Sequence, residues 1–107
     1  MQALAAGASY AVVDEYVGED ERLLLVADVL TAMQQCARDY RRYLNVPTLG
    51  LTGSNGKTTT KELFHAVLNM KYKVHATKGN LNNHIGVPLT ILCAPRDTEI
   101  LIVEMGR

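Results

Sequence analysis

Seven consecutive residues have the types and spacing of a phosphate-binding loop. Residues 53–59 read Gly-Ser-Asn-Gly-Lys-Thr-Thr. Glycine permits a tight turn and lets an anion approach the main chain closely, and a helix that starts at the loop adds free N–H groups. A lysine supplies a positive charge for the outer phosphates, and a threonine hydroxyl is an oxygen ligand that suits Mg²⁺. The predicted ATP-binding residues are Gly53, Ser54, Asn55, Gly56, Lys57, Thr58 and Thr59.

The spacing of the glycines differs from the common phosphate-binding loop at one position. The pattern Gly-x4-Gly-Lys-[Ser/Thr] requires a glycine at position 51, where this chain has Leu51. The shorter Gly-x-x-Gly-Lys-Thr is a weak motif by itself, and an ordinary glycine turn with a surface lysine would share it. Its setting favours the functional interpretation, because an apolar strand precedes the loop and an amphipathic helix follows it.

The segments after the loop alternate between helix and strand. From residue 48 onward the order strand, helix, strand, helix, strand predicts an α/β fold, in which a parallel sheet has helices on its faces. The helix would place Leu63, Val67 and Met70 on one face. The expected elements are a strand at 48–52, a helix from 57, a strand at 73–77, a short helix within 86–93 and a strand at 99–104.

The first part of the chain predicts two strands followed by a helix. Apolar runs at 10–14 and 23–27 indicate strands, the second of them buried. Asp28 is placed to cap a helix, which Pro47 must follow rather than continue. We therefore expect a domain boundary between residues 45 and 46. The predicted helix has one apolar face made of Leu30, Met33, Ala37, Tyr40 and Leu44.

Glu104 stands where a metal-binding carboxylate is expected. It ends the apolar strand at 99–104, a run typical of a strand buried on both faces. Acidic residues at the carboxyl ends of neighbouring parallel strands face the same crevice. The sequence thus predicts that Thr58 and Glu104 hold Mg²⁺, although a strand-end acid that faces solvent would look the same.

Composition excludes several classes of partner and location. Eleven basic and eleven acidic residues balance, so charge does not support a nucleic-acid or membrane-surface partner. No apolar run approaches the roughly 20 residues of a membrane span, and the start of the chain is unlike a signal peptide. Cys36 and Cys93 match no metal or redox spacing. We expect them to be small buried side chains in a cytoplasmic protein.

Three segments together resemble the Mur ligase family of cell-wall enzymes. Residues 52–62 are similar to that family's ATP loop, including its short glycine spacing, and residues 103–106, Val-Glu-Met-Gly, are similar to its magnesium-binding strand end. Residues 79–90, Gly-Asn-Leu-Asn-Asn-His-Ile-Gly-Val-Pro-Leu-Thr, look most like the member that adds D-alanyl-D-alanine.

The resemblance implies a reaction and its participants. ATP would phosphorylate the terminal carboxylate of a UDP-N-acetylmuramoyl peptide, and the amine of D-alanyl-D-alanine would attack the acyl phosphate. Lys57, Asn80 and Asn83 would then be catalytic, with the asparagines donating neutral hydrogen bonds near the reacting groups. The alternative for the asparagines, including Asn82, is that they only form the turn.

The resemblance also implies that the chain is incomplete. Residues 1–45 would be the end of the domain that holds the UDP-sugar, and residues 46–107 the start of the central ATP domain. We expect a sheet of three strands to expose an apolar edge such as 100–103, through which copies of the chain could associate. Two alternatives remain open: a non-catalytic ATP-binding remnant, and a related ligase such as folylpolyglutamate synthase.

Overall fold

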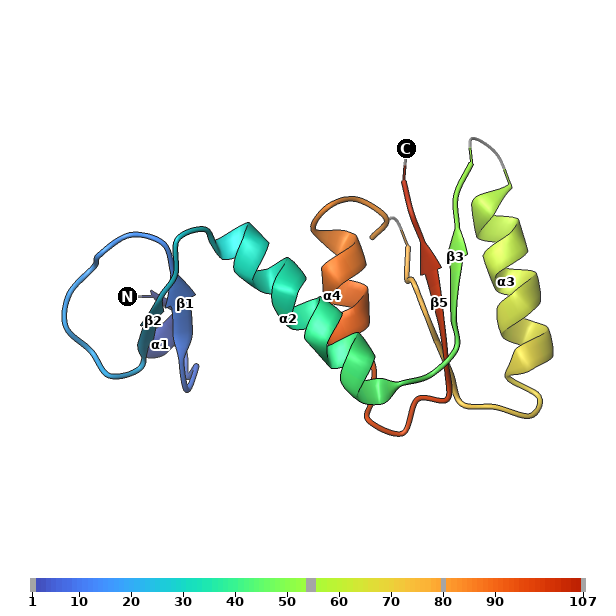
Figure 1. Ribbon diagram of the computed structural model, residues 1–107, viewed down its shortest axis with the longest axis horizontal. Helices are drawn as coiled ribbons and strands as arrows, with labels where there is room; N and C mark the ends of the chain where they lie inside the picture. The colour runs from blue at the N-terminus through green and yellow to red at the C-terminus, as the bar shows by residue number, and fades with distance from the viewer. Residues whose placement is uncertain (1, 54–55, 80, 107) are drawn as a thin grey trace. The chain divides into compact units, whose positions relative to one another are not determined.

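The computed structural model describes residues 2–53, 56–79 and 81–106. The chain forms two compact units, Met1–Gln34 and Gln35–Arg107. Both have the predicted α/β character, with parallel strands and flanking helices (Figure 1).

The N-terminal unit contains a small parallel sheet. Helix α1 (Gln2–Ala5) precedes strands β1 (Ala11–Val13) and β2 (Leu23–Leu25), which pair in parallel register. The expectation of a buried second strand is wrong, because Leu24 is 49% exposed and Leu25 is 63% exposed. Two strands give each other little cover, and the only helix wholly within the described part of this unit has four residues.

Helix α2 (Val29–Leu44) begins and ends as predicted. The backbone N–H of Thr31 donates to Asp28 Oδ2 at 3.0 Å, so Asp28 caps the helix. The helix ends before Asn45, whose φ of 50° is left-handed. In the C-terminal unit, Ala37 is buried and the Tyr40 hydroxyl donates to the carbonyl of Ala94 at 2.5 Å.

The C-terminal unit is a three-stranded parallel sheet between helices. Strands β3 (Thr48–Leu51), β4 (Val74–Ala76) and β5 (Ile100–Glu104) lie in the order β3-β5-β4. Figure 1 shows α3 (Lys57–Leu68) and α4 (Gly86–Leu92) on opposite sides of this sheet. Every residue of β5 is buried.

The prediction that residues 100–103 form an exposed edge is wrong. Strand β5 lies between β3 and β4, so the edges of this sheet are β3 and β4. Right-handed crossovers allow this when the first passes over one face and the second over the other. Four consecutive apolar residues gain the most from the central position, where both faces are covered.

Helix α3 turns an unexpected face to the sheet. The apolar face predicted for it exists, but Leu63 and Val67 are 63% and 66% exposed. The buried residue of α3 is Lys61, and His65 and Leu68 are partly buried. The two cysteines also differ from expectation, since the thiols of Cys36 and Cys93 are both free and exposed. Cys93 is the C-cap of helix α4, directly after its last residue.

Candidate functional site

The glycine loop joins the end of β3 to the start of α3. Gly53 has φ 127° and Gly56 has φ 76°, both in the region that favours glycine. A Cβ at either position would meet no atom within 4 Å, so backbone conformation rather than space requires glycine. Gly56 is the N-cap of α3, and its carbonyl accepts the N–H of Thr60. The predicted ligands Ser54 and Asn55 lie outside the described residues.

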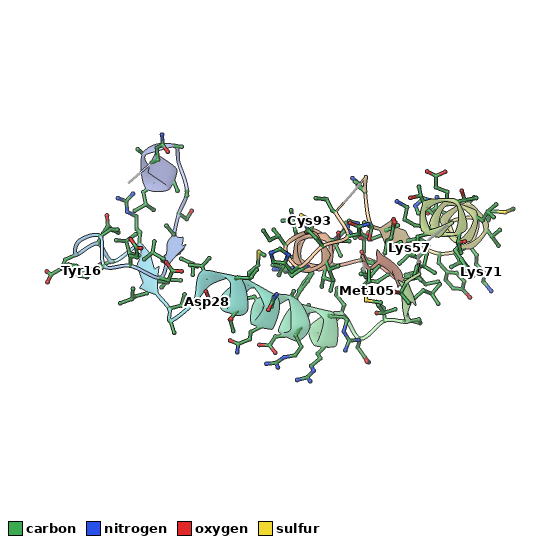
Figure 2. The ribbon with its side chains drawn as sticks, turned by 90° about the horizontal axis from the view of Figure 1, so that it is seen from above. Tyr16, Asp28, Lys57, Lys71, Cys93 and Met105 are labelled. Carbon is green, nitrogen blue, oxygen red and sulfur yellow. The ribbon has the colours of Figure 1, made fainter. Side chains whose placement is uncertain are left out.

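Lys57 directs its charge toward the end of β5. Its Nζ donates to the carbonyl oxygen of Met105 at 3.2 Å, and both residues are labelled in Figure 2. Met105 in turn donates its N–H to the carbonyl of Leu51 at 2.7 Å, which ties the end of β5 to the end of β3. Thr58 and Thr59 follow Lys57 in the first turn of the helix and are exposed. The amino end of α3 therefore presents an ammonium group and two accessible hydroxyl groups at the carboxyl ends of β3 and β5.

Glu104 is buried at the carboxyl end of β5 rather than facing solvent. The residue is 3% exposed, and its backbone N–H donates to the hydroxyl of Thr77, which follows β4, at 2.9 Å. Its Oε2 atom has no hydrogen-bond partner in the described part of the chain. An anionic oxygen in this state is costly unless a cation compensates its charge.

The cation nearest to Glu104 is one that the sequence interpretation missed. A lysine on an amphipathic helix is ordinarily solvated, but Lys61 is only 6% exposed, and its Nζ lies 3.6 Å from Glu104 Oε2. One signal was available: Lys61 follows Lys57 by four residues, which places both lysines on the same side of α3. That side faces β5, so both charges point toward the end of the same strand.

We call residues 78–84 the asparagine loop, and its described part contacts the end of β5 through its backbone. The carbonyl of Asn82 accepts the N–H of Gly106. Asn83 Oδ1 accepts the N–H groups of Ile85 at 3.1 Å and Gly86 at 2.7 Å, so this side chain caps α4. Any contact of Asn83 with a substrate is therefore left to its amide nitrogen. Asn80 lies outside the described residues.

Two glycines allow this loop to pack closely. A Cβ at Gly86 would lie 2.4 Å from the backbone carbon of Leu81, and one at Gly106 would lie 2.8 Å from the carbonyl oxygen of Asn82. The sequence pattern does not predict either approach, because each joins residues that only folding brings together.

His75 links strand β4 to helix α4. Its Nε2 lies 2.9 Å from the carbonyl oxygen of Thr90, and burial lowers the pKa of the ring below 6.5.

In the part of the chain that the structure describes, no three residues among His, Cys, Asp and Glu are grouped to hold a metal ion. A metal at Glu104 would thus need hydroxyl, water or phosphate oxygens to complete its coordination.

The comparison with protein families decides the affiliation of the chain. The family described as the Mur ligase middle domain matches residues 51–107. This chain belongs to the Mur ligase family. The match covers the glycine loop, the asparagine loop and Glu104, which are the segments described above.

Mur ligases that resemble the chain are known from several bacteria. The UDP-N-acetylmuramoyl-tripeptide--D-alanyl-D-alanine ligase of Bacillus subtilis is 51% identical over 98% of this chain and 24% of the relative. The enzyme of the same name from Synechocystis is 49% identical over the same shares. The chain spans about a quarter of the length of the curated relatives that it matches.

Solved Mur ligase structures share the fold of this chain. MurF from Acinetobacter baumannii superposes with a TM-score of 0.92 at 34% identity, covering 99% of this chain and 24% of that one. MurF from Thermotoga maritima, solved in complex with ADP, superposes with a TM-score of 0.89 at 35% identity, covering 98% of this chain and 25% of that one.

None of the helices in the described ranges is both long and apolar enough to cross a membrane.

Proposed function

We propose that this chain is the nucleotide-binding part of an ATP-dependent ligase that joins D-alanyl-D-alanine to a UDP-N-acetylmuramoyl peptide. The observation that carries the proposal is that Lys57, which follows the glycine loop, contacts Met105, the residue next to the buried Glu104 at the carboxyl end of β5. The names of the relatives supply the substrates, and the ADP complex of one structural neighbour supports the nucleotide. In this proposal residues 1–45 end the domain that holds the UDP-sugar, residues 46–107 begin the ATP domain, and the enzyme is cytoplasmic.

The reaction activates a carboxylate, which is a poor electrophile. An oxygen of the peptide carboxylate attacks the γ-phosphorus of ATP, the bond to the β–γ bridging oxygen breaks, and ADP leaves with that electron pair. The amine of D-alanyl-D-alanine then attacks the acyl carbon, inorganic phosphate leaves, and the nitrogen loses a proton. The first step brings two anions together, so positive charge at the site lowers its barrier.

The loop residues would bind the phosphates, and Lys57 would provide the mobile charge. Gly53, Ser54, Asn55, Gly56 and Thr59 would supply main-chain N–H groups and hydroxyls to the phosphates. The ammonium of Lys57 now donates to a neutral carbonyl at 3.2 Å. A phosphate oxygen is a stronger, charged acceptor, so we expect the ammonium to exchange Met105 for the phosphate when ATP binds.

The residues at Glu104 fit a magnesium ion. The Oε2 atom of Glu104 is buried and lacks a hydrogen-bond partner in the described residues, and the hydroxyl of Thr58 is exposed at the start of α3. Mg²⁺ is typically held by one or two protein oxygens together with phosphate and water. When bound, the ion would neutralise charge on the phosphates. Asn80 and Asn83 would donate neutral hydrogen bonds to the reacting carboxylate or phosphate.

Calorimetric titration of the chain with Mg-ATP tests this proposal. We expect binding by the wild-type chain and none by Lys57→Ala, because the substitution removes the charge that meets the phosphates. Lys71→Ala is the matched control, since it removes one lysine charge beyond the carboxyl end of α3, whereas Lys57 begins that helix. Equal binding by all three chains, or by none, would contradict the proposed role of the loop.

A ligase assay separates the enzyme from a binding remnant. A protein of the relatives' length that includes this chain should be tested with UDP-N-acetylmuramoyl tripeptide and D-alanyl-D-alanine. Release of phosphate that requires both substrates supports the proposal. Nucleotide binding without such release would instead identify a non-catalytic module.

A further inference from the structure

Lys61 and Glu104 form a buried ion pair that is incomplete. Both side chains are buried, and their nearest N and O atoms are 3.6 Å apart. At that distance the charges attract, but the contact is longer than a good N–H···O hydrogen bond. Glu104 Oε2 accepts no other hydrogen bond from the described residues. A buried carboxylate oxygen with a nearby positive charge but no donated hydrogen can still accept a closer ligand.

We propose that Lys61 is a place-holding cation for the magnesium site. It neutralises Glu104 while the site is empty and withdraws its ammonium from Oε2 when the divalent ion binds. The inference rests on the proposed function, because it assumes that Glu104 is a magnesium ligand. Lys61 acts through Glu104 and is a positioning residue rather than a catalytic one.

A recess beside Lys61 can accommodate its ammonium group when it leaves Glu104. A recess of about 500 Å³ lies beside its side chain, between α3 and the β4 edge of the sheet. Its lining includes Lys61 itself, the carboxylate-bearing Glu62 and the partly buried His65. The lysine side chain has a flexible stem of four carbons, so its ammonium group can move. The ammonium can therefore leave Oε2 and remain hydrated in the recess, whose lining carries one acidic residue, Glu62, and one further lysine, Lys78.

Charge repulsion between Lys61 and a bound metal ion predicts how removal of Lys61 changes the metal affinity. An ammonium and a divalent cation compete for the same oxygen, and each raises the free energy of the other there. Removal of Lys61 should thus tighten metal binding. It should also lower stability in the absence of metal, because a buried carboxylate loses its compensating charge. A lysine that merely orients Glu104 would have the opposite effect on affinity.

The test measures binding of Mn²⁺ alone to the chain. The concentration of free Mn²⁺ is monitored by electron paramagnetic resonance. Mn²⁺ shares the preference of Mg²⁺ for carboxylate and water oxygens. We expect Lys61→Met to bind Mn²⁺ about tenfold more tightly than wild type. The variant should melt at a lower temperature without metal and regain more on adding Mn²⁺ than wild type does. Lys61→Arg, which keeps the charge, and Lys71→Met, which removes a distant one, should both bind like wild type.

A second measurement on the wild-type chain covers the case in which Lys61→Met does not fold. Acetylation by acetic anhydride, located by mass spectrometry, reports the accessibility of each lysine. We expect labelling of Lys61 to increase several-fold when Mg²⁺ is added, while that of Lys71 stays constant. Unchanged or reduced labelling of Lys61 in the metal-bound chain would overturn the proposal.

The outcomes separate this inference from the proposed function. If the wild-type chain binds Mn²⁺ and Glu104→Gln does not, the metal site stands. Weaker or equal binding by Lys61→Met then overturns only the place-holding role. If wild type and Glu104→Gln bind equally, Glu104 is not a metal ligand, and both the magnesium assignment and this inference fail.

Discussion

Single atoms decide which glycines can be replaced. Gly86→Ala would bring a Cβ within 2.4–2.6 Å of three backbone atoms of Leu81, whereas Gly50→Ala would meet only the terminal methyl of Met105, at 2.7 Å. A backbone cannot yield as the end of a flexible side chain can. We expect Gly86→Ala to lower the free energy of unfolding by about 1–3 kcal/mol and Gly50→Ala to change it much less, as measured by urea denaturation. Equal effects would show that the asparagine loop does not pack as described.

His75 makes stability depend on pH. Burial lowers the pKa of its ring below 6.5, the backbone contact with Thr90 acts in the opposite direction, and the charge of Lys78 lowers the pKa further. The unfolded chain then binds more protons than the folded chain between 6.5 and the lower folded value. The contribution to stability is complete above pH 6.5 and is lost as the pH falls through that window.

Melting curves above pH 6.5 and at about pH 5 test this dependence. We expect Tm to fall on acidification, and to fall less in His75→Gln, which does not titrate and can still donate to Thr90. The same loss of Tm in wild type and variant would rule out His75 as the cause.

At the level of elements, burial is concentrated in β5 and not in α3. Leu101 of β5 is 0% exposed and Leu63 of α3 is 63% exposed. The same substitution therefore has different consequences. We expect Leu101→Ala to lower the free energy of unfolding by about 2–5 kcal/mol and Leu63→Ala to change it by no more than about 0.5 kcal/mol. Chemical denaturation of the two variants would measure both, and a comparable loss in each would mean that the outer face of α3 is covered.

For the whole molecule, open sheet edges and exposed apolar side chains predict association. The sheet of the C-terminal unit ends at β3 and β4, and unpaired strand edges can pair with another chain. We propose that the 107-residue chain self-associates through such an edge. Sedimentation equilibrium should show an average mass that increases with concentration, with a Tm that rises in parallel. A monodisperse monomer whose melt is independent of concentration would refute this.

Local patterns were enough to predict most of the elements. The order of strands and helices after residue 48, the Asp28 cap and the break at Pro47 all depend on neighbours in the chain. The run of apolar residues in β5 likewise requires burial in any compact fold. The same holds for the glycine loop, because its φ values and its position before a helix are local properties.

Contacts between distant segments decided the rest. That β5 is the central strand, that Lys61 reaches Glu104, and that Gly86 and Gly106 pack against the asparagine loop all involve residues brought together only by folding. Periodicity shows that a helix has two faces, but which face meets the sheet depends on what the partner strand presents. Here β5 presents a buried carboxylate, and the side of α3 with Lys57 and Lys61 meets it because opposite charges in a low-dielectric interior must lie together.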